Sequence, residues 1–309
     1  MFSFRGSSHM KVAVLMGGKS AERDISLASG RAVCEALSTL KIEHVMFDPA
    51  VQPLSELQAM NIDLAFIILH GRGGEDGTIQ GALEYLEIPY TGSGVLGSAL
   101  AMDKIHTKEI WVARQLPTPN FVRVNVPLQE AEANKILCEF AHNIMVKPSH
   151  EGSSIGMAKV QNSAELIAAV NTALELDNEV LLEAYVTGQE YTVAILDDVA
   201  LPSIRMVTPH EFYDYAAKYQ DNTTEYFCPS GLTDDEEQQL ATLCLDAFRS
   251  VSATGWGRVD VMRDETGQFL LLEVNTVPGM TTKSLVPKAA RQAGIDFPNL
   301  VLKIMQTVR

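Results

Sequence analysis

The sequence has no apolar run that approaches the roughly 18 residues of a membrane-spanning helix. It is also poor in cysteine, and Cys34, Cys138, Cys228 and Cys244 show neither metal-type spacing nor a paired pattern, which predicts reduced thiols in a reducing compartment. Basic residues are in deficit, 24 against 39 acidic ones, and the net charge of −15 argues against a general binder of nucleic acids or acidic membranes. We therefore expect a cytoplasmic protein with no nucleic-acid and no membrane partner.

Several motifs of catalytic and nucleotide-binding proteins are missing as well. The sequence contains no GxSxG, no HExxH and no cysteine with a matching histidine signature, so no nucleophile–base arrangement emerges. A GxxxxGK[ST] loop is absent, and KVAVLMGGKS lacks the third glycine and the distal acidic residue expected of a dinucleotide-binding fingerprint. Residues 1–10, MFSFRGSSHM, resemble a tag and cloning scar and are left out of the fold argument; no signal peptide is expected.

The patterns that are present favour an α/β fold, α+β in part. Continuous apolar strands are predicted at 11–18 and 63–71, and an amphipathic helix is predicted at 21–40. Buried strands that alternate with such helices indicate a parallel sheet. Further along, helices are expected at 102–116 and 163–176. With 309 residues, of which 46% are hydrophobic, the chain is long enough for two or three domains.

Three units follow from this pattern. We expect an N-terminal α/β domain at 11–94, a smaller central domain at 95–187 and a C-terminal domain at 188–309. The stretch 204–227 interrupts the last unit because it is long, irregular and rich in tyrosine. Loops of that length in compact domains tend to be functional or disordered, and the aromatic content favours an ordered lid.

A hairpin near the C-terminus carries the first candidate site. In GRVDVMRDETGQFLLLEVN (257–275) the DETG segment predicts a turn. If Asp264 pairs with Phe269, then Asp260 lies opposite Glu273, and Arg258 opposite Asn275. Two carboxylates that face each other across a strand pair repel unless a cation lies between them. Their oxygen atoms suit a hard ion such as Mg²⁺, although a solvated charged face is the alternative.

Other polar residues could serve a phosphorylated ligand. Lys147 ends a strand in VKPSHEGSSIG, and the glycine-rich loop after it could present backbone N–H groups to phosphate, with a plain turn as the alternative. Lys104 is a second candidate cation, unless it is a solvated helical lysine. Glu183 and Glu190 follow apolar strands, where a carboxylate could accept from an adenine amino group or a ribose hydroxyl.

Two residues of the N-terminal unit remain open between structural and functional roles. Glu22 stands at a helix start, where its charge suits the helix dipole. His70 ends a strand before GRGGEDG, a position where a lone histidine is more often structural. Taken together, oxygen ligands, two lysines, an arginine and a glycine-rich loop suit the stabilisation of a transferring phosphoryl group.

The order of these motifs resembles a known family. HGRGGEDGTIQG, YTGSG followed by MDK, VKPSHEGSSIGMAKV, FYDYAAKY, GWGRVDVM and EVNTVPGMTTKSLVP are similar to the D-alanine:D-alanine ligases of the ATP-grasp superfamily, from Lys11 to the C-terminus. The resemblance implies a three-domain ATP-grasp architecture and an ADP-forming ligase for peptidoglycan precursor synthesis. ATP would phosphorylate the carboxylate of one D-alanine, and the amine of a second D-alanine would attack the acyl phosphate. A homodimer through the N-terminal domain is also implied.

The resemblance carries over to individual positions. Two Mg²⁺ ions, or Mn²⁺ as an alternative, would be held by Asp260, Glu273 and Asn275, and the ATP co-substrate by Lys104, Lys147, Ser154, Glu183, Glu190 and Lys218. The first D-alanine would be held by Glu22 and His70. The oxyanion would be stabilised by Arg258 and the backbone N–H of Gly279, and the second carboxylate held by Ser284 and the backbone at Leu285. Ser153 and Tyr219 would link with Glu22 to close the lid over the acyl phosphate, which must be kept from water.

Some positions depart from the family pattern, and some alternatives stay open. His150 replaces the usual basic residue before EGSS, Lys283 stands where histidine is frequent, and Ala184 and Tyr185 replace a common lysine–tryptophan pair. The acceptor could be D-lactate or D-serine, although Tyr219 favours D-alanine. Another ATP-grasp carboxylate–amine ligase is disfavoured by HGRGGEDG and TTKSLVP, and a non-catalytic ATP-binding regulator by the intact charged set.

Overall fold

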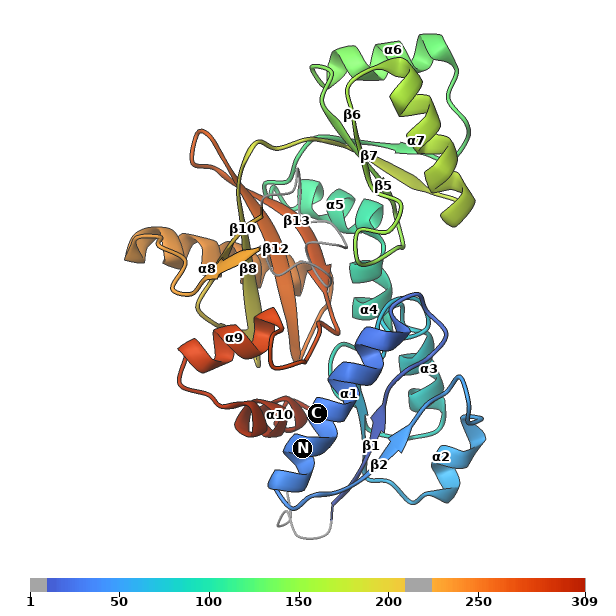
Figure 1. Ribbon diagram of the computed structural model, residues 1–309, viewed down its shortest axis with the longest axis vertical. Helices are drawn as coiled ribbons and strands as arrows, with labels where there is room; N and C mark the ends of the chain where they lie inside the picture. Colours follow the sequence, from blue (N-terminus) through green and yellow to red (C-terminus); the bar gives the residue numbers. More distant parts are fainter. Residues whose placement is uncertain (1–9, 209–223, 309) are drawn as a thin grey trace.

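The structure is a computed structural model, and it describes residues 10–208 and 224–308. Three separate sheets form the framework, and each falls within one of the proposed domains (Figure 1). No helix of these residues is long and apolar enough to cross a membrane.

The N-terminal sheet is parallel, as expected, with strand order β2-β1-β3. Its strands are β1 (Lys11–Leu15), β2 (Glu43–Phe47) and β3 (Leu64–Ile67), and its helices are α1 (Arg23–Thr39), α2 (Ser55–Ala59) and α3 (Thr78–Tyr85). The strands β1 and β3 lie side by side and are almost fully buried. Parallel neighbours end at the same edge of a sheet. The loops that follow these two strands, which contain Glu22 and His70, therefore emerge together.

The central sheet is antiparallel, with order β4-β7-β5-β6. Its strands are β4 (Phe121–Val124), β5 (Ile144–Pro148), β6 (Ala158–Val160) and β7 (Val180–Ala184), and its helices are α6 (Glu130–Glu139) and α7 (Ser163–Leu176). The helix expected at 102–116 corresponds to α5 (Lys104–Ala113). A separate helix, α4 (Val95–Met102), precedes it directly. Asp103 separates the two because its backbone is extended, and its side chain caps α5 by accepting from the backbone N–H of His106.

The C-terminal sheet is the largest, with order β11-β10-β8-β12-β13 and β9 attached to β8. Its strands are β8 (Gly188–Leu196), β9 (Val199–Ala200), β10 (Ile204–Val207), β11 (Glu225–Phe227), β12 (Trp256–Asp264) and β13 (Phe269–Asn275), and its helices are α8 (Asp234–Ser250), α9 (Leu285–Gln292) and α10 (Phe297–Gln306). The interpretation of 204–227 as irregular throughout is wrong at both ends, because β10 and β11 pair antiparallel there. The central part of the predicted lid lies outside the described residues.

The β12–β13 hairpin has the predicted pairs at its functional end only. Asp260 lies opposite Glu273, and Arg258 opposite Asn275. At the turn, however, Phe269 pairs with Arg263 and not with Asp264. A register shift between Asp260 and Val261 accounts for the difference, because it inserts one extra residue into β13. Bulges of this kind re-aim side chains and are over-represented next to active sites.

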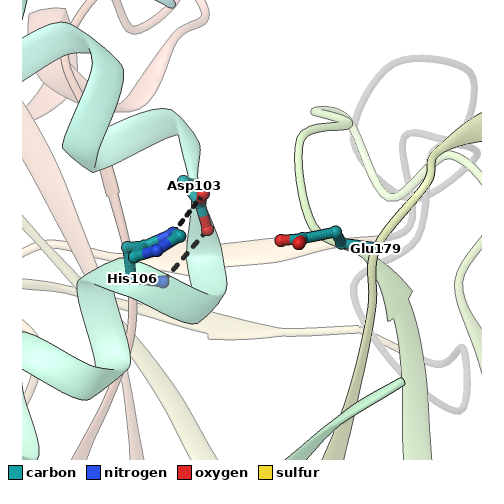
Figure 2. Close-up of side chains that lie close together, drawn as sticks. All are labelled: Asp103, His106 and Glu179. Carbon is teal, nitrogen blue, oxygen red and sulfur yellow. Dashed lines mark hydrogen bonds and ion pairs between the residues drawn. The ribbon is translucent and has the colours of Figure 1, made fainter. Parts of the chain in front are cut away.

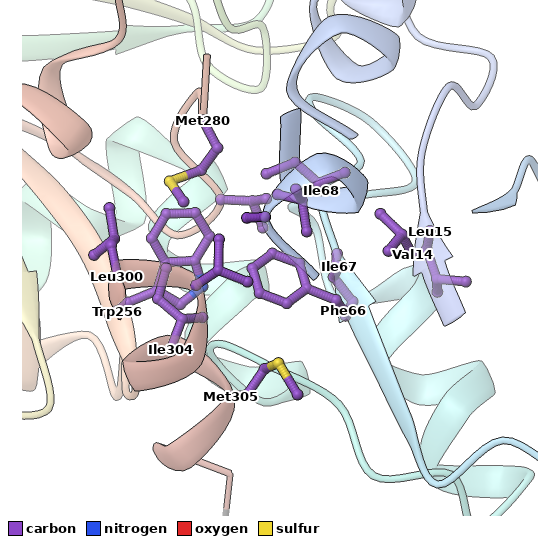
Figure 3. Packing of buried hydrophobic residues seen from close by; sticks show 14 of the residues in the cluster. Val14, Leu15, Phe66, Ile67, Ile68, Trp256, Met280, Leu300, Ile304 and Met305 are labelled. Carbon is purple, nitrogen blue, oxygen red and sulfur yellow. The ribbon is translucent and has the colours of Figure 1, made fainter. Parts of the chain in front are cut away.

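One hydrophobic core joins the N-terminal sheet to the end of the chain. Side chains of β1 and β3 belong to the same buried cluster as Trp256, Met280 and the apolar face of α10 (Figure 3). Phe66 and Trp256 lie with ring centroids 6.5 Å apart. The proposed division at residues 94 and 187 therefore separates sheets, whereas the core of the first unit is completed by the last helix of the third.

Candidate active site

Two cavities meet at one side chain, Glu273. The first, of about 460 Å³, lies between the central and C-terminal sheets. The second, of about 410 Å³, lies between the N-terminal loops and the segment 275–285. Glu273 lines both. The predicted residues along the first cavity are Lys104, Lys147, Ser154, Glu183, Glu190 and Asp260, and those along the second are Glu22, His70, Ser153, Arg258, Asn275, Gly279, Ser284 and Leu285.

Positive charge gathers on one wall of the first cavity despite the acidic chain. Lys104 and Lys147 are both buried. The Lys147 ammonium lies 3.2 Å from a carboxylate oxygen of Glu183. That of Lys104 donates to the backbone carbonyl of Glu151 at 2.7 Å and lies 3.7 Å from Glu273. Two ammonium groups beside the glycine-rich loop can attract phosphate oxygens, as the sequence predicted.

A third lysine, Lys108, was not anticipated from the sequence. Its side chain is fully buried, 3.2 Å from Glu183 and 2.5 Å from the hydroxyl of Thr118. Burial lowers the pKa of Lys108 to about 8, although the neighbouring Glu183 opposes that effect. The spacing could have revealed it, because residues four apart on a helix share one face and Lys108 is one turn beyond Lys104.

Three neighbouring side chains donate hydrogen bonds to Asp260. Arg258 donates two hydrogen bonds to its carboxylate, at 2.8 and 2.7 Å. The Thr192 hydroxyl and the Asn275 amide also donate to it, at 2.6 and 3.1 Å. The facing carboxylates are therefore balanced in part by protein cations, Arg258 beside Asp260 and Lys104 near Glu273. Protein side chains therefore supply part of the positive charge that the sequence analysis assigned to a bound cation.

The second cavity has an acidic floor. Glu22 is buried at the start of α1, and the Ser153 hydroxyl of the glycine-rich loop donates a hydrogen bond to it. Nδ1 of His70 lies 2.8 Å from the carbonyl oxygen of Val277. Burial lowers the pKa of His70, against the opposing influence of Glu22. A neutral histidine and a buried carboxylate form a pocket that favours an ammonium group.

Glu75 is a second residue that sequence reasoning missed. It lines the same cavity and accepts hydrogen bonds from the backbone N–H groups of Gly71 and Val277, at 2.7 and 3.3 Å. Burial, together with the nearby charge of Glu22, raises the pKa of Glu75 to about 8. Its place within HGRGGEDG was the available signal, but only the tertiary fold brings it beside Glu22.

The opposite wall of the second cavity is the start of α9. Ser284 precedes the first residue of this helix, Leu285, and its hydroxyl accepts from the backbone N–H of Thr281 at 3.0 Å. A β-carbon at Gly279 would come within 3.1 Å of that hydroxyl. The first backbone N–H groups of a helix lack partners within the helix and favour an anion. A carboxylate bound here would lie across the cavity from Glu22.

A separate acidic cluster is explained by the fold alone. Asp103, His106 and Glu179 lie close together, with ligand types that a metal ion could use (Figure 2). Asp103, however, caps α5, accepts from the Ser149 hydroxyl at 3.0 Å and pairs with His106. Glu179 pairs with Arg123. We regard the cluster as structural. Two further predicted residues, Lys218 and Tyr219, lie outside the described residues.

Comparison with known proteins agrees with this geometry. Residues 49–93 match the family model described as D-ala D-ala ligase N-terminus, and residues 110–306 match D-ala D-ala ligase C-terminus. The chain belongs to the D-alanine–D-alanine ligase family. Two curated ligases of this family are 55% identical over 298 residues (Pseudoalteromonas atlantica) and 56% identical over 295 residues (Alcanivorax borkumensis); the chain is covered to 96% in both, and the relatives to 94% and 92%.

Solved structures of family members have the same fold. The D-alanine–D-alanine ligase of Bacillus anthracis superposes with a TM-score of 0.86 at 35% identity, and its complex with ATP with 0.84 at 33% identity; each pair covers 97% of both chains. A D-Ala:D-Ser ligase from Enterococcus faecalis also matches, with a TM-score of 0.83 at 27% identity over 96% of this chain and 99% of the other. The fold by itself therefore does not distinguish acceptors.

Proposed function

We infer that this chain joins two D-alanine molecules to D-alanyl-D-alanine with ATP as co-substrate, releasing ADP and phosphate, for peptidoglycan precursor synthesis. Membership in the ligase family supports the reaction. The observation that supports this site for the reaction is the position of Glu273, which lines both cavities. A phosphoryl group bound at that wall can pass from a nucleotide in one cavity to a carboxylate in the other.

In the first cavity, we assign the phosphates to Lys104, Lys147 and the loop that includes Ser154. Glu183 and Glu190 would accept from adenine and ribose, as the sequence predicted. The buried ion pairs of Glu183 with Lys147 and Lys108 support a rigid carboxylate there. Lys218 is assigned to phosphate on the family resemblance alone.

In the second cavity, Glu22 would hold the ammonium of the first D-alanine, with His70 nearby. The second carboxylate would be held by Ser284 and the backbone at Leu285. Arg258 and the backbone N–H of Gly279 would stabilise the oxyanion formed when the amine attacks the acyl phosphate. The hydrogen bond from Ser153 to Glu22 supports a connection between loop and substrate site; Tyr219 would complete it when the lid closes.

The donor set fits Mg²⁺. Glu273 and Asp260 supply carboxylate oxygens and Asn275 an amide oxygen, and hard cations take such ligands. Two Mg²⁺ ions, with Mn²⁺ as an alternative, would neutralise charge on the transferring phosphate. We predict that Glu273→Ala abolishes turnover and leaves the fold intact, because it removes a ligand and also relieves the repulsion with Asp260. Circular dichroism and ADP release as a function of Mg²⁺ concentration measure the two effects, and wild-type-like turnover would refute the metal assignment.

The decisive experiment is ADP release with ATP and Mg²⁺ while candidate amino acids are added in turn. We expect strong stimulation by D-alanine alone and none by L-alanine, because one methyl group gives little selectivity and the paired charges must select stereochemistry. Release that also required D-lactate or D-serine would reassign the acceptor. Nucleotide binding without release would favour the regulator. We also propose that the protein is cytoplasmic and forms a homodimer. Sedimentation of the purified protein would test the homodimer.

A further inference from the structure

His150, one of the residues that depart from the family pattern, lies between two carboxylates. Its Nε2 is 3.0 Å from an oxygen of Asp103, and its Nδ1 is 3.0 Å from an oxygen of Asp177. Its backbone N–H also donates to Asp177, at 2.6 Å. The two carboxylates come from different elements, since Asp103 caps α5 and Asp177 follows α7. The imidazole ring therefore bridges the start of α5 and the segment that follows α7.

This geometry requires the doubly protonated ring. A neutral imidazole has one N–H donor and one acceptor nitrogen. Either tautomer would thus turn a nitrogen lone pair toward a carboxylate oxygen, on one side or the other. The imidazolium donates on both sides and carries the positive charge that both acids attract.

The bridge fixes the loop that we assign to phosphate. Residues 149–157 follow β5, and the hydroxyl of Ser149 donates to Asp103 at 3.0 Å. Immediately beyond His150, the carbonyl of Glu151 accepts from Lys104, the first residue of α5. Holding α5 and the loop together at His150 keeps Lys104 at its place in the nucleotide cavity.

Other charged groups face the same cluster. Nδ1 of His106, on α5, lies 2.5 Å from Asp103, at the same carboxylate oxygen that His150 contacts. Arg72, from the loop after β3, lies 3.6 Å from Asp177 and 2.7 Å from Glu151. Among the described residues, the cations around Asp177 are thus His150 and Arg72, and those around Asp103 are His150 and, when protonated, His106. Of these side chains, only His150 contacts both acids.

We propose that His150 is a positioning residue whose imidazolium form fastens the phosphate-binding loop to α5, so that nucleotide affinity falls when the ring loses its proton. The proposal rests on the nucleotide role assigned to this cavity. The hydrogen bonds that the ring donates to Asp103 and Asp177 raise the pKa of His150 to about 9, against a smaller effect of burial. The bridge is therefore complete at neutral pH and opens as the pH rises through about 9.

The test compares ADP binding in the presence of Mg²⁺ and without D-alanine, from pH 7 to pH 10.5, by titration calorimetry. His150→Arg keeps a cation at every pH of the series, and His150→Gln never carries one. His106→Gln is the matched control, because it removes an imidazole that touches Asp103 but does not bridge. A second readout follows the His150 ring by NMR, with its signal identified by its loss in His150→Gln.

We expect wild-type affinity to fall about three- to tenfold through pH 9 relative to His150→Arg, the size of one lost hydrogen bond of ordinary net strength. His150→Gln should bind weakly already at pH 7, and His106→Gln should follow the wild type. Lys108 is present in all these proteins, so its titration contributes equally to their pH profiles and cancels in the comparison with His150→Arg. Parallel pH profiles in wild type and His150→Arg, or a ring that titrates near its ordinary value, would overturn the proposal. A protein that bound no nucleotide at any pH would refute the proposed function instead, while the NMR titration would still decide the bridge.

Discussion

Two ionisable residues of the site, Lys108 and Glu75, have pKa values of about 8 for opposite reasons. Burial disfavours the charged form of each, so it lowers the pKa of the ammonium and raises that of the carboxyl group. Lys108 retains a carboxylate partner in Glu183. Glu75 has the like charge of Glu22 nearby. At neutral pH Glu75 therefore holds its proton and adds no negative charge of its own to the substrate cavity.

Glu75→Gln should reveal that proton in the stability of the unliganded protein. A raised native pKa means that the unfolded state loses its proton first, near pH 4.5, so wild-type stability falls from there to about pH 8. The amide cannot titrate, although it gives up one backbone hydrogen bond at all pH values. The difference in unfolding free energy should thus shift toward the variant by about 4 kcal/mol between pH 5 and pH 9. Urea unfolding at both pH values measures it.

A fitting control is Glu87→Gln, outside the two site cavities. Its difference from wild type should be nearly constant over the same pH range. A constant difference for Glu75→Gln as well would mean that Glu75 is ionised at neutral pH, and the cavity would then hold two negative charges.

At the scale of elements, the sequence predicts regular structure well and irregular structure poorly. The helix at 163–176 appears as α7 with the same bounds, because Asn162 caps it and its apolar positions recur at helical spacing. The bulge in β13 was not predictable, since one extra residue in FLLLEV leaves the apolar pattern unchanged. The pairs that matter for the site were still correct, because the shift lies on the turn side of Asp260. Lys108 and Glu75 acquire their surroundings only when distant elements meet.

The glycine-rich loop passes close to the Glu22 carboxylate at Gly152. A β-carbon at Gly152 would lie 2.7 Å from a carboxylate oxygen of Glu22, closer than atoms tolerate. Gly152→Ala should displace Glu22 or the loop and raise the KM for D-alanine by roughly tenfold, the loss of about 1.4 kcal/mol of substrate binding. The fold should persist, because the change is confined to a loop. Initial rates as a function of D-alanine concentration provide the measurement.

Gly81→Ala in α3 is the matched control, since the nearest atom to its new methyl group, on Val95, is 3.8 Å away. It should leave the KM unchanged. Were Gly152→Ala to do the same, Glu22 would not be the residue that holds the substrate ammonium.

On the scale of the whole molecule, the first and third of the three predicted domains share one hydrophobic core. Composition and strand pattern separate three sheets, and the structure contains all three. No local sequence pattern predicts that α10 packs against α1, some 270 residues earlier, or that Trp256 packs against Phe66. These contacts fix the N-terminal loops against the segment 275–285, and the substrate cavity lies between them. The integrity of the substrate site should therefore depend on the last helix.

Ile304→Ala tests this dependence. Ile304 is fully buried in α10 within the shared core, and truncation of such a side chain costs about 2–5 kcal/mol. Because the core belongs to both ends of the chain, we expect one cooperative transition that moves to lower urea concentration as a whole.

Trp256 reports on this core and Trp111 on the separate core beneath α8, so the backgrounds Trp111→Phe and Trp256→Phe follow the two regions by fluorescence. Leu96→Ala, at a side chain that is 61% exposed, should change stability by less than about 0.5 kcal/mol. Two separate transitions, with only the Trp256 signal shifted by Ile304→Ala, would show that the N-terminal unit and α10 unfold apart from the rest.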